Sequence, residues 1–309
     1  METVDDSPTP TPACSSSDSK PPPSPNPSSI SSPLPPSATR LWRPAAQRNL
    51  RNQWSKLASQ RQQWASASSS GKSHANSLVN AYLSQRYMPS LELGVLSDMA
   101  GIRKKACRKL FKQQEIYRSK VLSSYKDMVA AVTQMLNASQ SMRCFLKGTS
   151  NSILVQFSGS SEDQNDTGDG GGIPVFVFWS ISSHEELAEE LVQMFKMELM
   201  LKRLLVLEFL SITCEVPQVN GFHWSDELYP GEFDHLRVCN LFSEETCEPV
   251  PPKLMNLKSD TPVVGCNNQP NQEVLQVYLT TWLAEVNINN YRVDEIFDVI
   301  QEEMHVRLK

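Results

Sequence analysis

The chain has 309 residues, a formal net charge of −5, and seven cysteines that are widely spaced and form no CxxC pair. An odd number of scattered cysteines suits free thiols in a reducing compartment, and the acidic first residues contain neither a secretory signal nor a basic transit peptide. The most apolar stretch, residues 199–212, is short for a bilayer and contains Lys202, Arg203 and Glu208. The sequence therefore predicts a protein of the nucleus or cytosol, with no membrane segment.

Charge is divided unevenly along the chain. Residues 40–126 contain 17 Lys and Arg against 3 Asp and Glu, whereas residues 160–309 contain 9 against 26. The two parts are therefore expected to meet different partners, or each other.

The N-terminal residues have the composition of a disordered tail. Residues 1–39 contain 11 of the 21 prolines and 11 serines, with few aliphatic side chains. Such a segment cannot bury enough apolar surface to offset the chain entropy lost on folding. The sequence thus predicts three parts: a disordered tail at 1–40, a basic helical segment at 41–147 and an acidic α-rich domain at 148–309.

An amphipathic helix is expected to begin near Leu41, with Pro44 in its first turn. A stripe at spacings of four and three follows it through Leu50, Trp54, Leu57, Arg61 and Trp64. The serine-rich residues 66–73 predict the end of this helix, and a second helical pattern runs up to Pro89.

Residues 91–147 contain no proline and predict the longest helix of the chain. Its second half keeps a repeat of four and three through Val121, Tyr125, Met128, Val132, Met135, Ser139, Met142 and Leu146. A core-facing helix of a bundle and an intermolecular coiled coil both produce this repeat. The e and g positions beside this repeat lack the sustained pattern of opposite charges that is typical of coiled coils, which favours the bundle.

The acidic part begins with a predicted hairpin and ends with helices. Residues 152–157 and 173–179 are β-rich runs around an acidic, glycine-rich loop. Ser183 and Glu186 form a capping-box pattern that predicts a helix start. The second half of that helix, residues 199–210, is apolar on almost every side and should lie in the middle of the fold. Two further helical patterns occupy the C-terminal end, so the predicted class is mainly α: a helical bundle with a long central helix and one small β hairpin.

Catalytic and cofactor motifs are weak throughout the sequence. Gly71, Lys72 and Ser73 resemble the end of a phosphate-binding loop, but Ser66 stands where its first glycine should be. The histidines and cysteines of the acidic part do not have the spacing of a zinc site. We therefore expect a protein that is not an enzyme and has no cofactor, metal or small-molecule substrate; an unrecognised active site between the hairpin and the acidic segment is the alternative.

One group of charges suggests a binding surface. At helical angles of about 100° per residue, five cations fall within one arc, opposite apolar residues such as Ile102 and Leu110. The five are Lys104, Lys105, Arg108, Lys109 and Lys112. They can contact nucleic acid, dock on the acidic half of this chain, or form an ordinary solvated face.

Three tryptophans are candidate anchors for a protein partner. Trp42, Trp54 and Trp64 alternate with arginines just after the predicted tail. Large aromatic side chains dominate many protein interfaces, but they also fill cores. The sequence leaves both interpretations open.

Two stretches carry a family resemblance: LWRPAAQRNLRNQWSKLASQRQQWASASSSGKSHANSLVNAYLSQRYMP from Leu41 and GGIPVFVFWSISSHEELAEELVQMFKMELMLKRLLVLEFL from Gly171. They resemble plant-specific proteins required for meiotic DNA double-strand-break formation. The resemblance implies a nuclear accessory factor in the initiation of meiotic recombination. Such a factor helps the topoisomerase-like cleavage machinery through other recombination-initiation proteins and does not cut DNA itself. The alternative is a cytoplasmic or spindle-associated scaffold whose basic helix binds an acidic protein surface.

Overall fold

The computed structural model describes residues 36–147, 156–158, 166–214, 222–255 and 270–308, all of which belong to one compact unit. Helices dominate this part of the chain, which confirms the mainly α class. The elements are α1 (Pro36–Tyr87), the short 3-10 helix η1 (Gly94–Leu96), α2 (Ile102–Gln140), β1 (Phe145–Lys147), β2 (Gln156–Ser158), α3 (Ile181–Ser211), α4 (Glu232–Val238), β3 (Phe242–Ser243), β4 (Glu248–Pro249), α5 (Gln272–Ala284) and α6 (Asn290–Met304). The predicted tail lies outside the described residues except for residues 36–40, which begin α1 earlier than expected.

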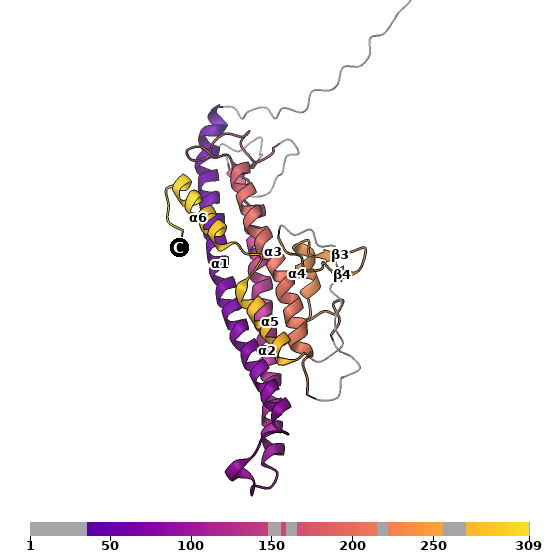
Figure 1. Cartoon of the computed structure of the whole chain (residues 1–309). Coiled ribbons are helices and arrows are strands. Elements are labelled where there is room, and N and C mark those ends of the chain that lie inside the picture. The colour runs from indigo at the N-terminus through magenta and orange to yellow at the C-terminus, as the bar shows by residue number, and fades with distance from the viewer. Residues whose placement is uncertain (1–35, 148–155, 159–165, 215–221, 256–269, 309) are drawn as a thin grey trace, which may run out of the picture. The chain divides into compact units, whose positions relative to one another are not determined.

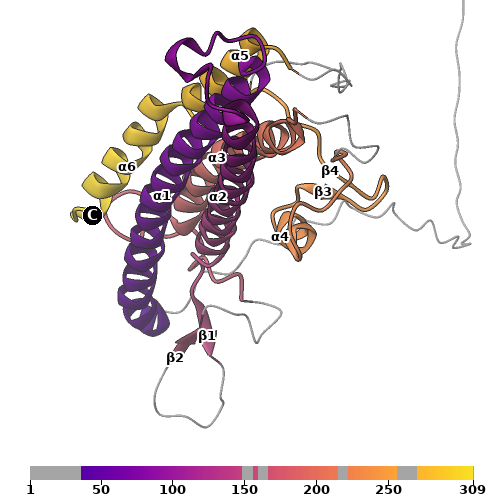
Figure 2. The same ribbon diagram turned by 90° about the horizontal axis from the view of Figure 1, so that it is seen from below.

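Three long helices form the centre of the fold. α1 and α2 run antiparallel along each other, and α3 packs against α2 (Figure 1). Figure 2 shows α6 beside α1, and α4 on the opposite side next to α2. α5 packs on α1 and α3. α3 contacts α1, α2, α5 and α6, which agrees with the long central helix that the sequence predicts from about Ser183 to Ile212.

The repeat of four and three along α2 faces this bundle. The buried members of the repeat are Val121, Tyr125, Met128, Val132, Met135, Ser139 and Met142. The repeat therefore belongs to a core-facing helix of this chain, as the lack of a sustained charge pattern at the e and g positions suggests. The side chain of the last predicted position, Leu146, lies outside the described part.

The predicted break at residues 66–73 is wrong, because α1 continues through it. With 52 residues α1 is also longer than α2, which has 39. The small side chains here make room for Trp282 of α5. A Cβ atom on Gly71 would lie 2.5 Å from the ring of Trp282. The indole nitrogen of Trp282 also donates a 3.0 Å hydrogen bond to the carbonyl oxygen of Ser68. Tertiary packing thus overrides the low helix propensity of serine and glycine.

α2 begins later than predicted, at Ile102 instead of near residue 91. Gly94 and Gly101 have φ angles of 51° and 73°, which interrupt a helix and which glycine adopts without strain. η1 lies between them. Residues 88–101 are therefore a turn between two helices, and we call them the tip.

α3 begins at Ile181, slightly before the predicted capping box. Ser180 has an extended backbone and is the N-cap, because its hydroxyl accepts a hydrogen bond from the amide of Ser183. The second half of α3 is buried on most sides, which confirms the predicted position in the middle of the fold.

The strands differ from the predicted hairpin. β1 pairs antiparallel with β2, and β3 pairs with β4, whereas residues 173–179 form no strand. The backbone of the latter segment is bound by side chains: Val175 O accepts from Arg43 and Gln47 of α1, and the amides of residues 177–179 all donate to Glu303 of α6. These bonds replace a strand ladder. Part of the other predicted strand lies outside the described residues.

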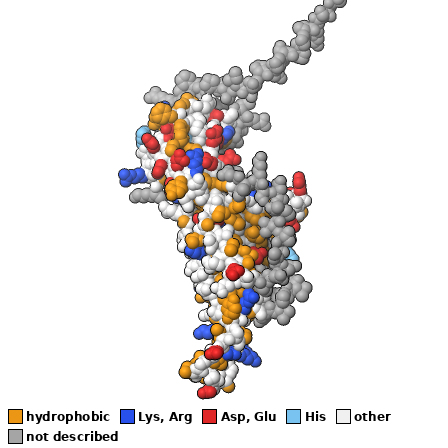
Figure 3. Space-filling model, viewed as in Figure 1, with side chains coloured by type: hydrophobic (Ala, Val, Ile, Leu, Met, Phe, Trp, Pro, Cys, Tyr) orange, Lys and Arg blue, Asp and Glu red, His pale blue; other side chains and the backbone are white. Residues whose placement is uncertain are grey.

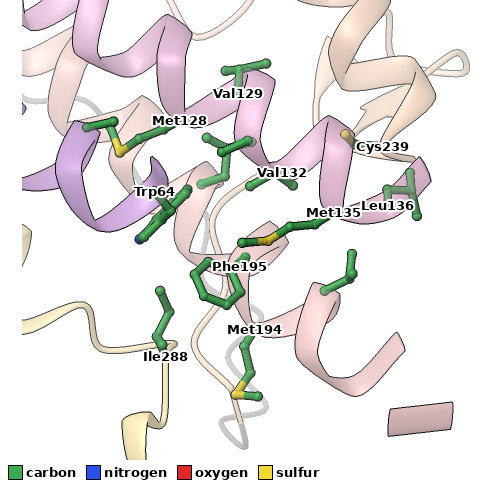
Figure 4. Close-up of a cluster of buried hydrophobic side chains, with 14 of the residues drawn as sticks. Trp64, Met128, Val129, Val132, Met135, Leu136, Met194, Phe195, Cys239 and Ile288 are labelled. Carbon is green, nitrogen blue, oxygen red and sulfur yellow. The ribbon is translucent and has the colours of Figure 1, made fainter. Parts of the chain in front are cut away.

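Figure 4 shows a part of the core to which all three long helices contribute. The rings of Trp64 and Phe195 meet edge to face with centroids 5.3 Å apart, near Val132 of α2. Cys239, just after α4, and Ile288, between α5 and α6, belong to the same cluster. The basic and acidic parts of the sequence therefore share one core.

Arg203 of α3 holds α4 through a buried ion pair. Its Nε lies 2.8 Å from Glu232, and its other nitrogens donate to the carbonyl oxygens of Trp224 and Asp226. Glu232 also accepts a 2.7 Å hydrogen bond from the hydroxyl of Tyr125 in α2. One carboxylate thus joins α2, α3 and α4.

Lys202, the neighbouring residue, holds α5 in the same way. Its ammonium lies 3.2 Å from Glu198 and 3.8 Å from Glu285, and it donates to the carbonyl oxygen of Trp282. Glu285 accepts a further hydrogen bond from Trp64 of α1. Burial lowers the pKa of Lys202 and raises that of Glu198, and the attraction between the two charges opposes both shifts.

Candidate binding surface at the α1–α2 turn

Arg103 holds the tip against the start of α2. Its guanidinium donates hydrogen bonds to the carbonyl oxygens of Pro89 and Leu91. Figure 1 shows the tip at the end of the bundle, beyond α3 and α5. None of the side chains in residues 83–113 is buried. The first three turns of α2 therefore extend outside the core on an ordered turn.

The five predicted cations form one exposed surface, which we call the basic face. Its members are Lys104, Lys105, Arg108, Lys109 and Lys112, and all are exposed. Ile102 and Leu110, on the opposite side of the helix, are partly covered. No ion pair or hydrogen bond holds the side chains of the basic face within the described part of the chain.

These cations are unfavourable for the helix that carries them. A helix N-terminus carries a partial positive charge, yet α2 has no acidic residue in its first turn and has Lys104 and Lys105 there instead. Like charges four residues apart, such as Lys104 and Arg108, also repel each other. Because the basic face weakens α2, its role is better explained by binding than by stability.

Apolar side chains are exposed on the tip beside the basic face. Val95 is 93% exposed and Met99 is 55% exposed, and Leu91 and Leu96 accompany them. Glu92 and Asp98 are exposed in the same turn. Figure 3 shows hydrophobic and charged side chains together at this end of the bundle. Exposed apolar clusters of this kind mark interaction surfaces.

Other cations of the basic segment pair with the acidic part of the same chain. Arg61 lies 2.6 Å from Asp294 of α6, and Arg143 binds the carboxylate of Glu185 in α3 at 2.8 and 3.0 Å. The two parts of opposite charge thus meet in the body of the bundle. The basic face takes no part in these contacts.

The three tryptophans proposed as partner anchors are core residues. Trp42, Trp54 and Trp64 are 2%, 0% and 2% exposed. Trp42 donates a 2.9 Å hydrogen bond to the carbonyl oxygen of Cys144, and Trp54 packs edge to face on Phe297. Of the two interpretations left open by the sequence, burial supports core packing. A partner can reach these rings only if the bundle opens.

His184 at the start of α3 is a perturbed titratable group that the sequence did not reveal. It is fully buried, with ring centroids 6.4, 6.0 and 5.8 Å from those of Trp54, Phe176 and Trp179, and neither ring nitrogen has a hydrogen-bond partner in the described structure. Burial lowers the pKa of His184 to about 4, although the carboxylate of Glu303 acts in the opposite direction. The imidazole is therefore neutral at pH 7 and acts as a packing group.

The other candidate chemistry of the acidic part remains dispersed. His223 and His235 are exposed, whereas Cys239 is buried with its sulfur 3.6 Å from the hydroxyl of Thr133. Among the described residues, no three His, Cys, Asp or Glu side chains are grouped to hold a metal ion. No described helix is both long and apolar enough to cross a membrane.

The apolar part of the tip is the feature of this surface that sequence reasoning missed. Residues 91–147 were expected to form one helix, which would have placed Val95 and Met99 on it. Pro89, followed at short intervals by Gly94 and Gly101, is the pattern that indicates a turn.

Comparisons with known proteins add no family assignment to this geometry. No family model matches the chain, and a search of curated proteins finds no significant match. A proposal for function therefore depends on the exposed surface and on the sequence resemblance.

Proposed function

We propose that the protein is a non-catalytic accessory factor in the initiation of meiotic recombination, and that it acts in the nucleus through the basic face and the tip. The observation that carries the binding role is a group of five exposed cations on an ordered helix outside the core, none of which has a partner among the described residues. The process and the compartment come from the resemblance of residues 41–89 and 171–210 to plant-specific proteins of double-strand-break formation.

A protein partner fits the whole surface better than DNA alone. DNA bound to the basic face would leave the apolar side chains of Val95 and Met99 in water and would approach the carboxylates of Glu92 and Asp98. A protein surface with acidic and apolar side chains can cover all of them. Other recombination-initiation proteins are the proposed partners, and DNA is a second ligand of the five cations.

The DNA contact can be tested by a salt titration. Each phosphate neutralised by a cation releases counterions, so the logarithm of the binding constant should fall linearly with the logarithm of salt concentration. Replacing Lys105, Lys109 and Lys112 by Glu should flatten that slope by about 3, at about 0.9 per contact. An unchanged slope in fluorescence anisotropy with a labelled duplex would remove DNA from the proposal and leave the protein partner.

The process is tested in cells. A tagged chain should enter the nuclei of meiotic cells, and its loss should lower the number of meiotic double-strand breaks. A tagged chain confined to the cytoplasm or the spindle, with normal break numbers in its absence, would contradict the proposal and favour a scaffold.

A further inference from the structure

Two exposed helix faces of this chain have opposite charge and the same spacing. On α2, Lys104, Arg108 and Lys112 follow each other at intervals of four residues. On α6, Asp294, Asp298 and Glu302 are exposed at the same intervals. Both rows therefore extend about 12 Å along a helix, with successive charges about 6 Å apart. We call the row on α6 the acidic face.

The two faces cannot meet within one chain. α6 lies along α1 near residues 51–61, since Arg61 pairs with Asp294 and Arg51 donates to the carbonyl oxygen of Met304. α1 then continues as an uninterrupted helix from Arg61 to Tyr87 before the tip begins. At 1.5 Å per residue this stretch covers about 40 Å, which is far beyond the reach of a side chain.

Each face also has exposed apolar neighbours. Val95 and Met99 lie on the tip beside the basic face, and at the start of α6 Tyr291 is 90% exposed, close in sequence to the half-exposed Val286. Stable interfaces combine a desolvated apolar centre with charged residues around it. Both faces therefore offer the two components of an interface, with opposite sign of charge.

We propose that a second copy of this chain places its basic face and tip on the acidic face of α6. Such a contact joins two different surfaces, so an open row of copies keeps one basic face and one acidic face free at its ends, whereas a closed ring keeps none free. The result is a ring or an open row of copies. The inference goes beyond the proposed function, because an open row still presents a basic face to another partner at its end.

Sedimentation equilibrium of the full chain tests the inference. At about 0.05 M salt the average mass should exceed that of one chain, 34.7 kDa, and should rise with protein concentration. At about 0.5 M salt it should return toward one chain, because screening weakens exposed charge pairs. A mass that stays at one chain in low salt at all concentrations would overturn the inference, while DNA binding and break formation would still report on the proposed function.

Charge reversal identifies the two faces. One variant changes all five cations of the basic face to Glu, and the other carries Asp298→Lys and Glu302→Lys; each alone should sediment as a single chain. A mixture of the two should associate again, since the reversed basic face then meets a reversed acidic face. Glu245→Lys with Glu273→Lys is the control, because it makes the same change in net charge at exposed positions elsewhere. Association that survives reversal of the acidic face, or a mixture that fails to associate, would overturn the assignment to α6.

Discussion

The body of the bundle and the tip use the same cationic residue types in opposite ways. In the body, Lys202 and Arg203 are fully buried, and each contacts a carboxylate and a carbonyl oxygen from outside its own helix. On the first turns of α2, five cations are exposed and have no partner in the described structure. The buried cations determine where α4 and α5 pack, whereas the exposed ones slightly weaken the helix that carries them.

Charge content alone therefore does not reveal the role of a cation. A buried charge whose partner is removed retains its full desolvation cost, so it is essential to the fold. Changing an exposed charge alters the free energy of unfolding very little, so such a residue is available for binding. The first and last of four predictions test this division directly, and the other two test the packing of the body.

The largest effect is expected from Arg203→Met. It leaves Glu232 buried without its cation, which should cost about 3–5 kcal/mol of the free energy of unfolding. Arg237→Met, which removes an exposed arginine that pairs with Asp234 and Glu244, is the control and should have a far smaller effect. Urea unfolding of both variants checks the prediction; similar losses in the two would contradict the central role of the buried pair.

The second prediction concerns acid sensitivity. Burial depresses the pKa of His184 from 6.5 to about 4. As the pH falls, the unfolded chain therefore binds a proton on His184 at a higher pH than the folded chain does. The stabilising contribution of neutral His184 is complete above pH 6.5 and is lost as the pH falls toward 4, which amounts to about 3 kcal/mol in total.

His184→Phe isolates this contribution, since the rings of Trp54, Phe176 and Trp179 surround the imidazole and no described residue forms a hydrogen bond with it. Between pH 7 and 5 the variant should lose less stability than the wild type. Thermal melts at both pH values measure the difference. Equal losses would show that His184 does not titrate as its burial requires.

Gly71→Ala should lower stability by about 1–3 kcal/mol, because the added methyl group meets the Trp282 ring. Helix propensity alone predicts a gain of up to about 1 kcal/mol. Ser70→Ala is the matched control in the same stretch, where the side chain is exposed. A melting temperature of Gly71→Ala at or above that of the wild type would show that Trp282 does not pack tightly on α1.

The smallest expected effect lies at the tip. Changing Lys104 and Lys105 to Glu places acids in the first turn of α2, which should raise stability by about 0.3–1 kcal/mol. The same change should weaken binding of the partner. A clear fall in the melting temperature would mean that the basic face serves the fold.

Much of the fold follows from local sequence patterns. The repeat from Val121 to Met142 placed α2 in the core, and the apolar circumference of residues 199–210 placed α3 in the middle. Both patterns act through neighbours on one helix, which is information that a sequence carries directly. The helical angles of the five cations likewise predict the basic face from sequence alone.

The failures come from contacts between distant residues. The serine-rich residues 66–73 were expected to end a helix, and they do not because Trp282, 214 residues from Ser68, packs there. Lys202 and Arg203 looked like interruptions of an apolar stretch, and nothing local indicates Glu232 or Glu285 as their partners. Residues 173–179 had a strand composition, but Arg43, Gln47 and Glu303 bind their backbone instead.

Complementation in meiotic cells shows whether the basic face binds a partner or builds the fold. A chain with Lys105, Lys109 and Lys112 changed to Glu should, as purified protein, melt at or above the temperature of the wild type. In meiotic cells that lack the protein, this variant should enter the nucleus. It should nevertheless fail to restore the number of double-strand breaks, whereas the wild type restores it. Full restoration of the breaks by this stable variant would show that the basic face is not the binding surface.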